Sequence, residues 1–224
     1  MLELQSVSFS YEKGNKKVNV LDDISVKFKP GVFYTIFGPS GSGKTTLLSL
    51  LGGLDVPQKG KVLFDTEDVK ITGLENLRKN HVSFVFQNFN LFSYMTAIEN
   101  VMVAIDISKI DIKNKKEYAS DILQELGLNL NEINRKVKKL SGGQQQRVAI
   151  ARALAVRANY ILADEPTGNL DKKTSEGIVE IFKQLVHKSN KCVIAVTHSD
   201  LVKQASDISY NLENGSLDLL EERL

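Results

Sequence analysis

The sequence has one cysteine, no export signal and no long apolar run. The single cysteine, Cys192, cannot supply a Cys/His metal cluster, and its position in the apolar run 192–196 predicts a buried strand residue in a reducing compartment. The first residues lack a basic segment followed by an apolar stretch, so we expect no secretion. Because no apolar segment approaches the roughly 20 residues that span a bilayer, any membrane contact is expected to come through a partner.

An excess of charge of one sign is also missing. The 29 lysine and arginine residues and the 27 aspartate and glutamate residues leave a formal net charge of +2. This balance gives no strong field for nucleic acid or anionic lipid, so we expect no nucleic-acid partner. At 224 residues the chain is long enough for one large α/β domain with an inserted subdomain, whereas two independent domains would be cramped.

Short β-branched and aromatic runs alternate along the chain with longer stretches of helical spacing. Continuous apolar strands of this kind suit a parallel sheet that is covered on both faces. The alternation therefore predicts an α/β fold with a mostly parallel core sheet, and the glycine-rich run Gly-Pro-Ser-Gly-Ser-Gly-Lys-Thr at residues 38–45 makes it one of the P-loop NTPase type. Strands are predicted at residues 32–37, 82–86, 160–163 and 192–196, and helices at residues 44–51, 145–157 and 175–187.

Other parts of the chain depart from this alternation. Residues 2–9 and 24–28 alternate apolar and polar side chains, which predicts an N-terminal antiparallel β subdomain, and Asn214-Gly215 lies at the centre of a hairpin pattern. Between about residues 88 and 140 amphipathic helical stretches replace the strand signal. We therefore expect one domain, in which residues 1–87 and 141–224 form the α/β core with its antiparallel subdomain and residues 88–140 form an inserted α-helical subdomain.

A glycine-rich run, Gly-Pro-Ser-Gly-Ser-Gly-Lys-Thr, follows the first predicted core strand and opens the next helix. It matches the P-loop pattern G-x-x-x-x-G-K-[ST], whose backbone N–H groups cradle phosphates. Lys44 is expected to reach the γ-phosphate of ATP and Thr45 to ligate Mg²⁺. A glycine turn without a ligand is the alternative, and the strand-turn-helix context argues against it. The residues expected to hold ATP here are Gly38, Pro39, Ser40, Gly41, Ser42, Gly43, Lys44, Thr45 and Thr46.

An acidic motif ends another predicted strand. Residues 160–165 read Tyr-Ile-Leu-Ala-Asp-Glu, an apolar strand followed by two carboxylates. In P-loop proteins an aspartate in this position holds Mg²⁺, and Asp164 is expected to do so. Glu165 is placed to polarise the attacking water as a general base. A solvated acidic turn before Pro166 is the alternative, which the P-loop in the same chain disfavours.

A second glycine-rich motif, Leu-Ser-Gly-Gly-Gln at residues 140–144, offers a hydroxyl and two glycine amides at the start of a predicted helix. Such a helix start is another ready anion site. One ATP needs only one phosphate cradle. The residues Ser141, Gly142, Gly143 and Gln144 therefore either hold a different anion or close over the γ-phosphate of a nucleotide that is bound to another subunit.

The same five residues resemble the signature of the ABC ATPases, and the resemblance covers nearly the whole chain. It implies that Tyr11 stacks on adenine, that Gln87 contacts Mg²⁺ and senses a transmembrane partner, and that Asp171 lies across the dimer. It also implies that His198 contacts the γ-phosphate and orients water beside Glu165. Without the resemblance, Tyr11 would be a surface aromatic, Gln87 a loop amide and His198 a histidine at the end of a strand.

In this family two copies pack head to tail around two ATP molecules, so the resemblance implies a homodimer beneath separately encoded transmembrane permease subunits. It places the protein in the cytoplasm, peripheral to the inner face of the membrane. Residues 84–91, 99–101 and 165–171 are similar to the lipoprotein-release, macrolide-export and bacitracin-type peptide-resistance ATPases.

The function expected from this branch is ATP hydrolysis that powers a bacterial transporter. Export of antimicrobial peptides or drugs, or resistance to them, is the first expectation for the cargo, and lipoprotein release or cell-division-type mechanical coupling is the second. A soluble ABC ATPase that acts on ribosomes or DNA is the alternative of another class. Such proteins usually carry two cassettes or long coiled coils, and this chain has neither.

Overall fold

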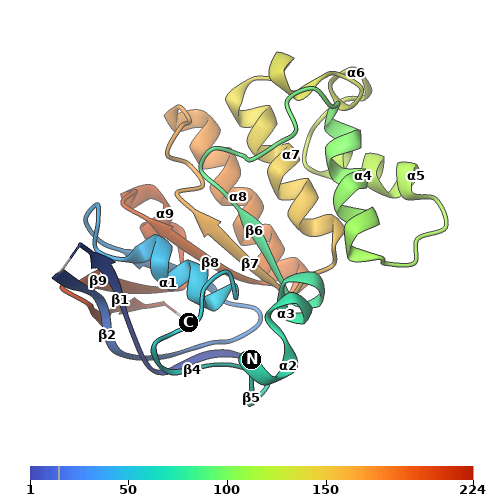
Figure 1. Cartoon of the computed structure of the whole chain (residues 1–224). Helices are drawn as coiled ribbons and strands as arrows, with labels where there is room; N and C mark the ends of the chain where they lie inside the picture. The colour runs from blue at the N-terminus through green and yellow to red at the C-terminus, as the bar shows by residue number, and fades with distance from the viewer. Residues whose placement is uncertain (15, 224) are drawn as a thin grey trace.

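Within residues 1–14 and 16–223, which the computed structural model describes, six strands form the central sheet in the order β10-β9-β3-β8-β7-β6 (Figure 1). All neighbouring pairs are parallel except the pair of β9 and β10, which is antiparallel. The predicted α/β class with a mostly parallel core sheet is thus confirmed. The strands are β3 (Phe33–Phe37), β6 (Val82–Val85), β7 (Tyr160–Asp164), β8 (Cys192–Thr197), β9 (Ile208–Glu213) and β10 (Ser216–Glu222).

Both faces of this sheet are buried, as the continuous apolar strands require. Along β7, Ile161 and Ala163 join the core under the large helices, whereas Tyr160 and Leu162 join the core on the opposite face. The alternation follows from the two-residue period of a strand. Cys192 on β8 is fully buried and unpaired, as predicted, and burial strongly raises the pKa of its thiol.

A second, antiparallel sheet has the order β2-β1-β4-β5. The N-terminal antiparallel element was predicted from the sequence, but β4 was missed. Gly60 in β4 has a φ of 76°, and a Cβ there would lie 2.2 Å from the carbonyl oxygen of Ser6. The backbones of β4 and β1 therefore approach closely at this glycine, and β4 lacks the regular alternation of apolar and polar side chains that would have predicted a strand. The strands are β1 (Leu2–Lys13), β2 (Lys16–Phe28), β4 (Lys59–Phe64) and β5 (Glu67–Asp68).

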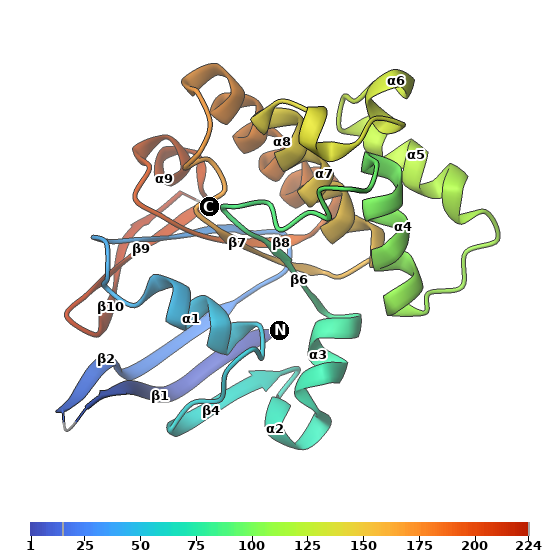
Figure 2. The same ribbon diagram turned by 45° about the horizontal axis from the view of Figure 1, so that its top comes forward.

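Helix α1 (Lys44–Leu51) lies between the two sheets and has the predicted bounds (Figure 2). Helix α8 (Lys172–Ser189) is followed by its C-cap residue Asn190, whose φ of 51° is the left-handed conformation that often ends a helix. No helix in the described part of the chain combines the length and the apolar character that a membrane crossing requires. The other helices are α2 (Val69–Thr72), α3 (Leu74–Asn80), α4 (Ala97–Ser108), α5 (Lys115–Glu125), α6 (Leu130–Ile133), the 3₁₀ helix η1 (Val137–Lys139), α7 (Gly142–Ala155) and α9 (Asp200–Ala205).

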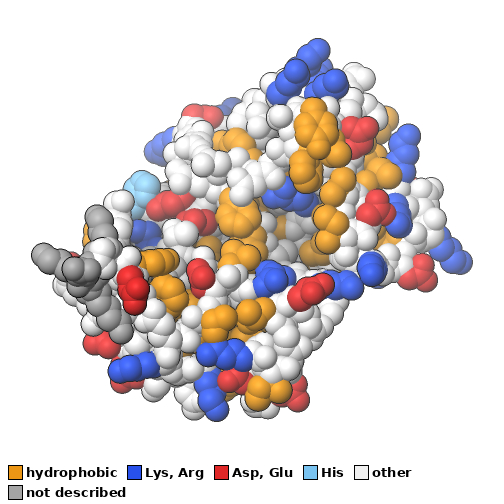
Figure 3. All heavy atoms as spheres, viewed as in Figure 1, with side chains coloured by type: hydrophobic (Ala, Val, Ile, Leu, Met, Phe, Trp, Pro, Cys, Tyr) orange, Lys and Arg blue, Asp and Glu red, His pale blue; other side chains and the backbone are white. Residues whose placement is uncertain are grey.

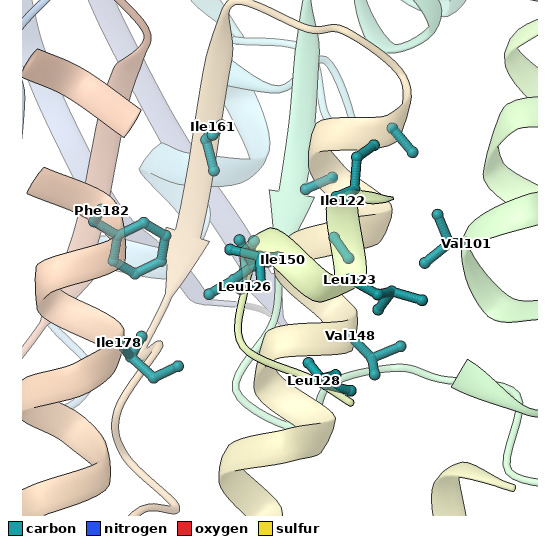
Figure 4. Packing of buried hydrophobic residues seen from close by; sticks show 14 of the residues in the cluster. Val101, Ile122, Leu123, Leu126, Leu128, Val148, Ile150, Ile161, Ile178 and Phe182 are labelled. Atoms are coloured by element: carbon teal, nitrogen blue, oxygen red, sulfur yellow. The ribbon is translucent and has the colours of Figure 1, made fainter. Parts of the chain in front are cut away.

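The helices between α4 and η1 share their core with the rest of the molecule. Figure 4 shows Val101 of α4 and Leu123 of α5 beside Val148 of α7, and all three belong to one buried cluster that continues to Ile161 of β7. Residues 88–96 contain no helix. The boundary near residue 140 therefore crosses a continuous core, and the division into a core and an inserted helical subdomain stays a prediction.

Candidate functional site

A pocket of about 580 Å³ opens where β3, β7 and β8 end and α1 begins. Crevices at the carboxyl ends of parallel strands are the usual ligand sites of open α/β sheets. The structure brings eleven of the predicted site residues to this pocket, and Val20 is the one lining residue that was not predicted. The pocket is lined by Tyr11, Val20, Ser40, Gly41, Gly43, Lys44, Thr45, Thr46, Gln87, Asp164, Glu165 and His198.

The loop between β3 and α1 has the geometry of a phosphate cradle. Gly43, the N-cap of α1, has a φ of 102°, and a Cβ there would lie 2.7 Å from a methyl carbon of Val20. Gly38 leaves no room for a side chain either, because its Cβ would lie 2.4 Å from the carbonyl oxygen of Leu212. The hydroxyl oxygen of Ser42 is buried without a hydrogen-bond partner. A buried unpaired hydroxyl in a glycine-rich loop at a helix start fits an anionic ligand.

Lys44 lies in this loop as a buried cation. Its Nζ donates to the carbonyl oxygens of Gly38 and Pro39, each at 2.8 Å. An ammonium has three N–H donors, so one remains for a phosphate oxygen. The lysine thus fixes the shape of the loop and keeps a positive charge at its centre.

The side chains of Thr45 and Asp164 lie next to each other in the pocket. The Thr45 hydroxyl donates to the two carboxylate oxygens of Asp164 at 3.2 and 3.4 Å. Burial, followed by the neighbouring Glu165, raises the pKa of Asp164, which the Thr45 hydrogen bond and Lys44 partly oppose. A group that carries such an unfavourable charge gains from a cation.

These oxygen donors fit Mg²⁺. The described residues contain no group of three or more His, Cys, Asp or Glu side chains that could hold a metal. Mg²⁺ is usually bound by one or two carboxylates together with substrate phosphates and water, so a sparse protein ligand set is what this ion requires. Gln87, the third predicted ligand, lines the same pocket.

Glu165 and His198 form a hydrogen-bonded pair. His198 Nδ1 lies 2.8 Å from Glu165 Oε1, and Glu165 Oε2 accepts a hydrogen bond from the Thr197 hydroxyl at 2.8 Å. The Glu165 side chain is only 14% exposed, against 69% for His198. Thr197 was not predicted as a site residue. The feature of the sequence that could have indicated it is a hydroxyl on the last residue of an apolar strand, directly before His198.

Tyr11 and Gln87 also line the pocket. The Tyr11 ring is 48% exposed, packs edge-on against Phe9, and its hydroxyl lies 3.2 Å from the Thr46 hydroxyl. An exposed aromatic face beside a phosphate cradle is available for stacking on a base. The backbone carbonyl of Gln87 accepts a hydrogen bond from Asn169 Nδ2 at 3.1 Å, which ties this residue to the loop after β7.

The second glycine motif lies elsewhere on the molecule. Ser141 to Gln144 do not line the pocket, and Figures 1 and 2 show the beginnings of α1 and α7 in separate places. Ser141 is exposed and caps α7: its hydroxyl oxygen accepts from Gln144 N, and Gln144 Oε1 accepts from Ser141 N. The N–H groups of Gly142 and Gly143 have no partner within the helix, so α7 presents them at its N-terminal end.

Asp171 lies beside this motif and not in the pocket. It caps α8 and accepts hydrogen bonds from the backbone N–H of Thr174 at 3.1 Å and from its hydroxyl at 2.5 Å, which lower the pKa of the Asp171 carboxyl. A Cβ on Gly143 would lie 2.3 Å from the Thr174 methyl carbon, so the starts of α7 and α8 touch. The predicted residues thus form two groups, a pocket and a separate pair of helix starts.

Comparison with known proteins shows the family of this chain. The sequence profile of the ABC transporter family matches residues 21–168. An uncharacterised ABC transporter ATP-binding protein of Bacillus subtilis, YclH, is 49% identical over 99% of this chain and 97% of its own length. The lipoprotein-releasing system ATP-binding protein LolD of Rickettsia bellii is 39% identical over 98% of each chain. The macrolide export ATP-binding/permease protein MacB of Syntrophobacter fumaroxidans is 41% identical over 97% of this chain, which spans 31% of that protein.

Two solved structures have the same fold. They are dimeric structures of the ABC cassette MJ0796 of Methanocaldococcus jannaschii, one of them in a post-hydrolysis state bound to ADP and phosphate. Each has a TM-score of 0.92 and covers 100% of this chain and 99% of the other, with sequence identities of 37% and 36%.

Proposed function

Because this chain belongs to the ABC transporter family as an ATP-hydrolysing, ATP-binding subunit, we propose that it works as a head-to-tail dimer that drives a separately encoded membrane permease. One observation carries the proposal: the pocket and the second glycine motif, residues 141–144 (called the Ser141 motif below), lie apart on a single chain. A second copy is needed to bring an exposed helix start over the phosphates. A symmetric pair would supply two such sites, and closed twofold pairs are the commonest assemblies.

In the pocket, each side chain has a distinct task. Lys44 holds the γ-phosphate with its remaining N–H, while the loop amides from Gly41 to Thr46 surround the phosphates. Glu165 accepts a proton from the attacking water, and His198, hydrogen-bonded to the same carboxylate, orients that water against the phosphate. Thr197 holds the carboxylate from the other side.

Mg²⁺ would be held by the Thr45 hydroxyl, the Asp164 carboxylate and Gln87. The ion neutralises charge that develops on the phosphates when it is bound. Asp164 suits this task because its own burial makes an uncompensated negative charge unfavourable.

The permease is proposed to dock in an apolar groove of about 610 Å³ between α3 and β6 on one side and α4 and α7 on the other. Figure 3 shows this face hollowed beside α4, with hydrophobic side chains around the hollow. The groove reaches Asn90, three residues after Gln87. Movement of a docked permease segment would therefore shift the position of Gln87 in the pocket. Its charged lining is mainly positive, which favours a permease segment that carries carboxylates. The charged lining residues are Arg78, Lys79, Lys109, Arg152 and Glu75.

For the cargo we propose export of antimicrobial peptides or drugs, or resistance to them. The support is the likeness to MacB, whose name records macrolide export. Lipoprotein release is the second candidate, because LolD is similar over almost its whole length. Both candidates place the protein on the cytoplasmic face of the membrane, held there by its permease.

The decisive experiment uses the variant Glu165→Gln. We expect phosphate release to fall by about 10²–10⁴-fold, the effect of losing a general base, while ATP binding persists and traps a dimer on size-exclusion chromatography. Glu125→Gln, which alters an exposed carboxyl on α5, is the control and should behave as wild type. A monomer with ATP bound would contradict the shared site, and unchanged hydrolysis would contradict the role of Glu165.

The partner and the cargo need separate tests. Lys109→Glu should prevent co-purification with the permease and leave phosphate release intact, with exposed Lys188→Glu on α8 as the control. Expression of this protein together with its permease in bacterial cells should raise the inhibitory concentration of a macrolide or a cyclic peptide antibiotic for those cells. Faster release of membrane lipoproteins without a change in resistance would select the second candidate, and recovery of the native protein with ribosomes would reject both.

A further inference from the structure

Helix α7 carries three consecutive glutamines, and the third, Gln146, is fully buried. Its Nε2 donates a hydrogen bond to the carbonyl oxygen of Pro166 at 2.7 Å. Its Oε1 is buried and has no hydrogen-bond partner. Buried polar atoms are nearly always paired, so an amide kept in the core with one unpaired atom calls for an explanation other than stability.

The bond from Gln146 ends on the turn that carries Glu165. Pro166 is the second residue of a turn closed by a 3.0 Å hydrogen bond from Gly168 N to the carbonyl oxygen of Glu165. Glu165 itself has a φ of 44°, a conformation that is disfavoured for a residue with a side chain and persists only where the surroundings hold it. The Glu165 backbone is thus a strained point at the pocket.

Two elements fix this turn from different sides. Strand β8 holds it through the hydrogen bond from Glu165 N to the Val196 carbonyl and through the Thr197 hydroxyl on the Glu165 carboxylate. Helix α7 holds it through Gln146, on the buried carbonyl one residue further along. The Gln146 bond therefore sets the position of the turn relative to the helix that begins at Gly142.

We propose that Gln146 is a positioning residue for ATP hydrolysis, which holds the strained turn so that the Glu165 carboxylate meets the attacking water. The inference rests on the proposed role of Glu165 as general base. A base must lie within hydrogen-bond distance of the proton that it accepts, and misplacement by about 1 Å costs on the order of 10²-fold in rate. One lost anchor on a strained turn is sufficient for a smaller shift.

The test is Gln146→Met, which keeps the length of the side chain and removes its donor. We expect kcat for phosphate release to fall by about tenfold, as a partial misplacement of the base requires, while the KM for ATP stays within about twofold. The melting temperature should stay within about 4 °C of wild type. The reason is that the Pro166 carbonyl loses a partner while the unpaired Oε1 disappears, and the two effects oppose each other.

The neighbouring Gln145→Met is the matched control, because Gln145 also donates to a backbone carbonyl, that of Leu140, but does not reach the turn. It should keep kcat within about twofold. Equal losses in both variants, or a lower melting temperature with unchanged kcat, would overturn the inference. Gln146→Leu repeats the test should the methionine variant fail to fold.

A double variant separates this inference from the proposed function. In the Glu165→Gln background, Gln146→Met should cause no further loss, because effects of residues that act as a unit are not additive. A further tenfold loss there would show that Gln146 does not act through Glu165. A fully active Glu165→Gln variant would instead refute the role of the base itself.

Discussion

The contact between the starts of α7 and α8 gives a prediction that can be worked out from the structure. In Gly143→Ala the added Cβ would lie 2.3 Å from the methyl carbon of Thr174, about 1.1 Å closer than the 3.4 Å at which ordinary contact begins. Thr174 cannot simply rotate, because its hydroxyl donates to Asp171 at 2.5 Å. Either the two helices move apart or the threonine gives up that hydrogen bond.

Both outcomes destabilise the protein. Overpacking costs about 1–3 kcal/mol, and loss of the hydrogen bond costs about 1 kcal/mol. Alanine returns up to about 1 kcal/mol through its better helix propensity. We therefore expect a net loss of up to about 2 kcal/mol, which for a chain of this size lowers the melting temperature by up to about 8 °C. Phosphate release should fall as well, because the Ser141 motif and Asp171 no longer keep their spacing.

A second substitution isolates the cause. Thr174→Ser removes the methyl that collides and keeps the hydroxyl that bonds Asp171, so the variant that combines Gly143→Ala with Thr174→Ser should regain most of the lost stability. Thermal unfolding of the four proteins gives the coupling energy between the two positions. Additive effects of the two substitutions on the free energy of unfolding would refute the idea that glycine is required here by contact with α8.

Three further predictions concern the pocket. Lys44→Ala should abolish binding of a fluorescent ATP analogue, and unchanged affinity would remove the P-loop assignment. Tyr11→Ala should weaken ATP affinity by about 1–3 kcal/mol if the ring stacks on the base; calorimetry that finds an unchanged Kd would leave Tyr11 structural. The raised pKa of Asp164 means that its charge destabilises the fold above that pKa and that this penalty disappears as the pH falls through it. Asp164→Asn should therefore raise the free energy of unfolding at pH 7 by about 0.5–2 kcal/mol, with the difference closing in acid; a less stable asparagine variant at pH 7 would contradict the burial argument.

The sequence predicted those parts of the fold that depend on local pattern. Four of the parallel strands, β3, β6, β7 and β8, together with α1, are continuous apolar runs bounded by stop signals, and the hairpin turn at Asn214 and Gly215 has the two positive φ values that its residue types favour. Strand β4 was missed because its regular features are few: Gly60 and the exposed lysines at positions 59 and 61 hide its alternation. Its pairing with β1 is decided by a distant backbone contact that no local pattern records.

The site was predictable where a motif fixes the chemistry and hidden where only the fold brings residues together. Lys44 and Asp164 are 120 residues apart in the chain, yet Lys44 belongs to a glycine-rich motif that follows one predicted strand, and Asp164 belongs to an acidic motif that ends another. Gln146 has no such motif, and the only signal of Thr197 is its position directly before His198. A threonine at a strand end and a glutamine inside a helix become relevant only once β8 and α7 are seen to hold the same turn.

The charge of Lys44 connects the construction of the loop with the choice of ligand. A buried ammonium is unfavourable unless it is paired, and this one has two backbone carbonyls but no ion pair with a carboxylate among the described residues. Carbonyl dipoles offset only part of that cost. An anion that meets the third N–H completes the compensation without moving the loop. The same lysine thus shapes the cradle and leaves it selective for a ligand that carries negative charge, as the phosphates of ATP do.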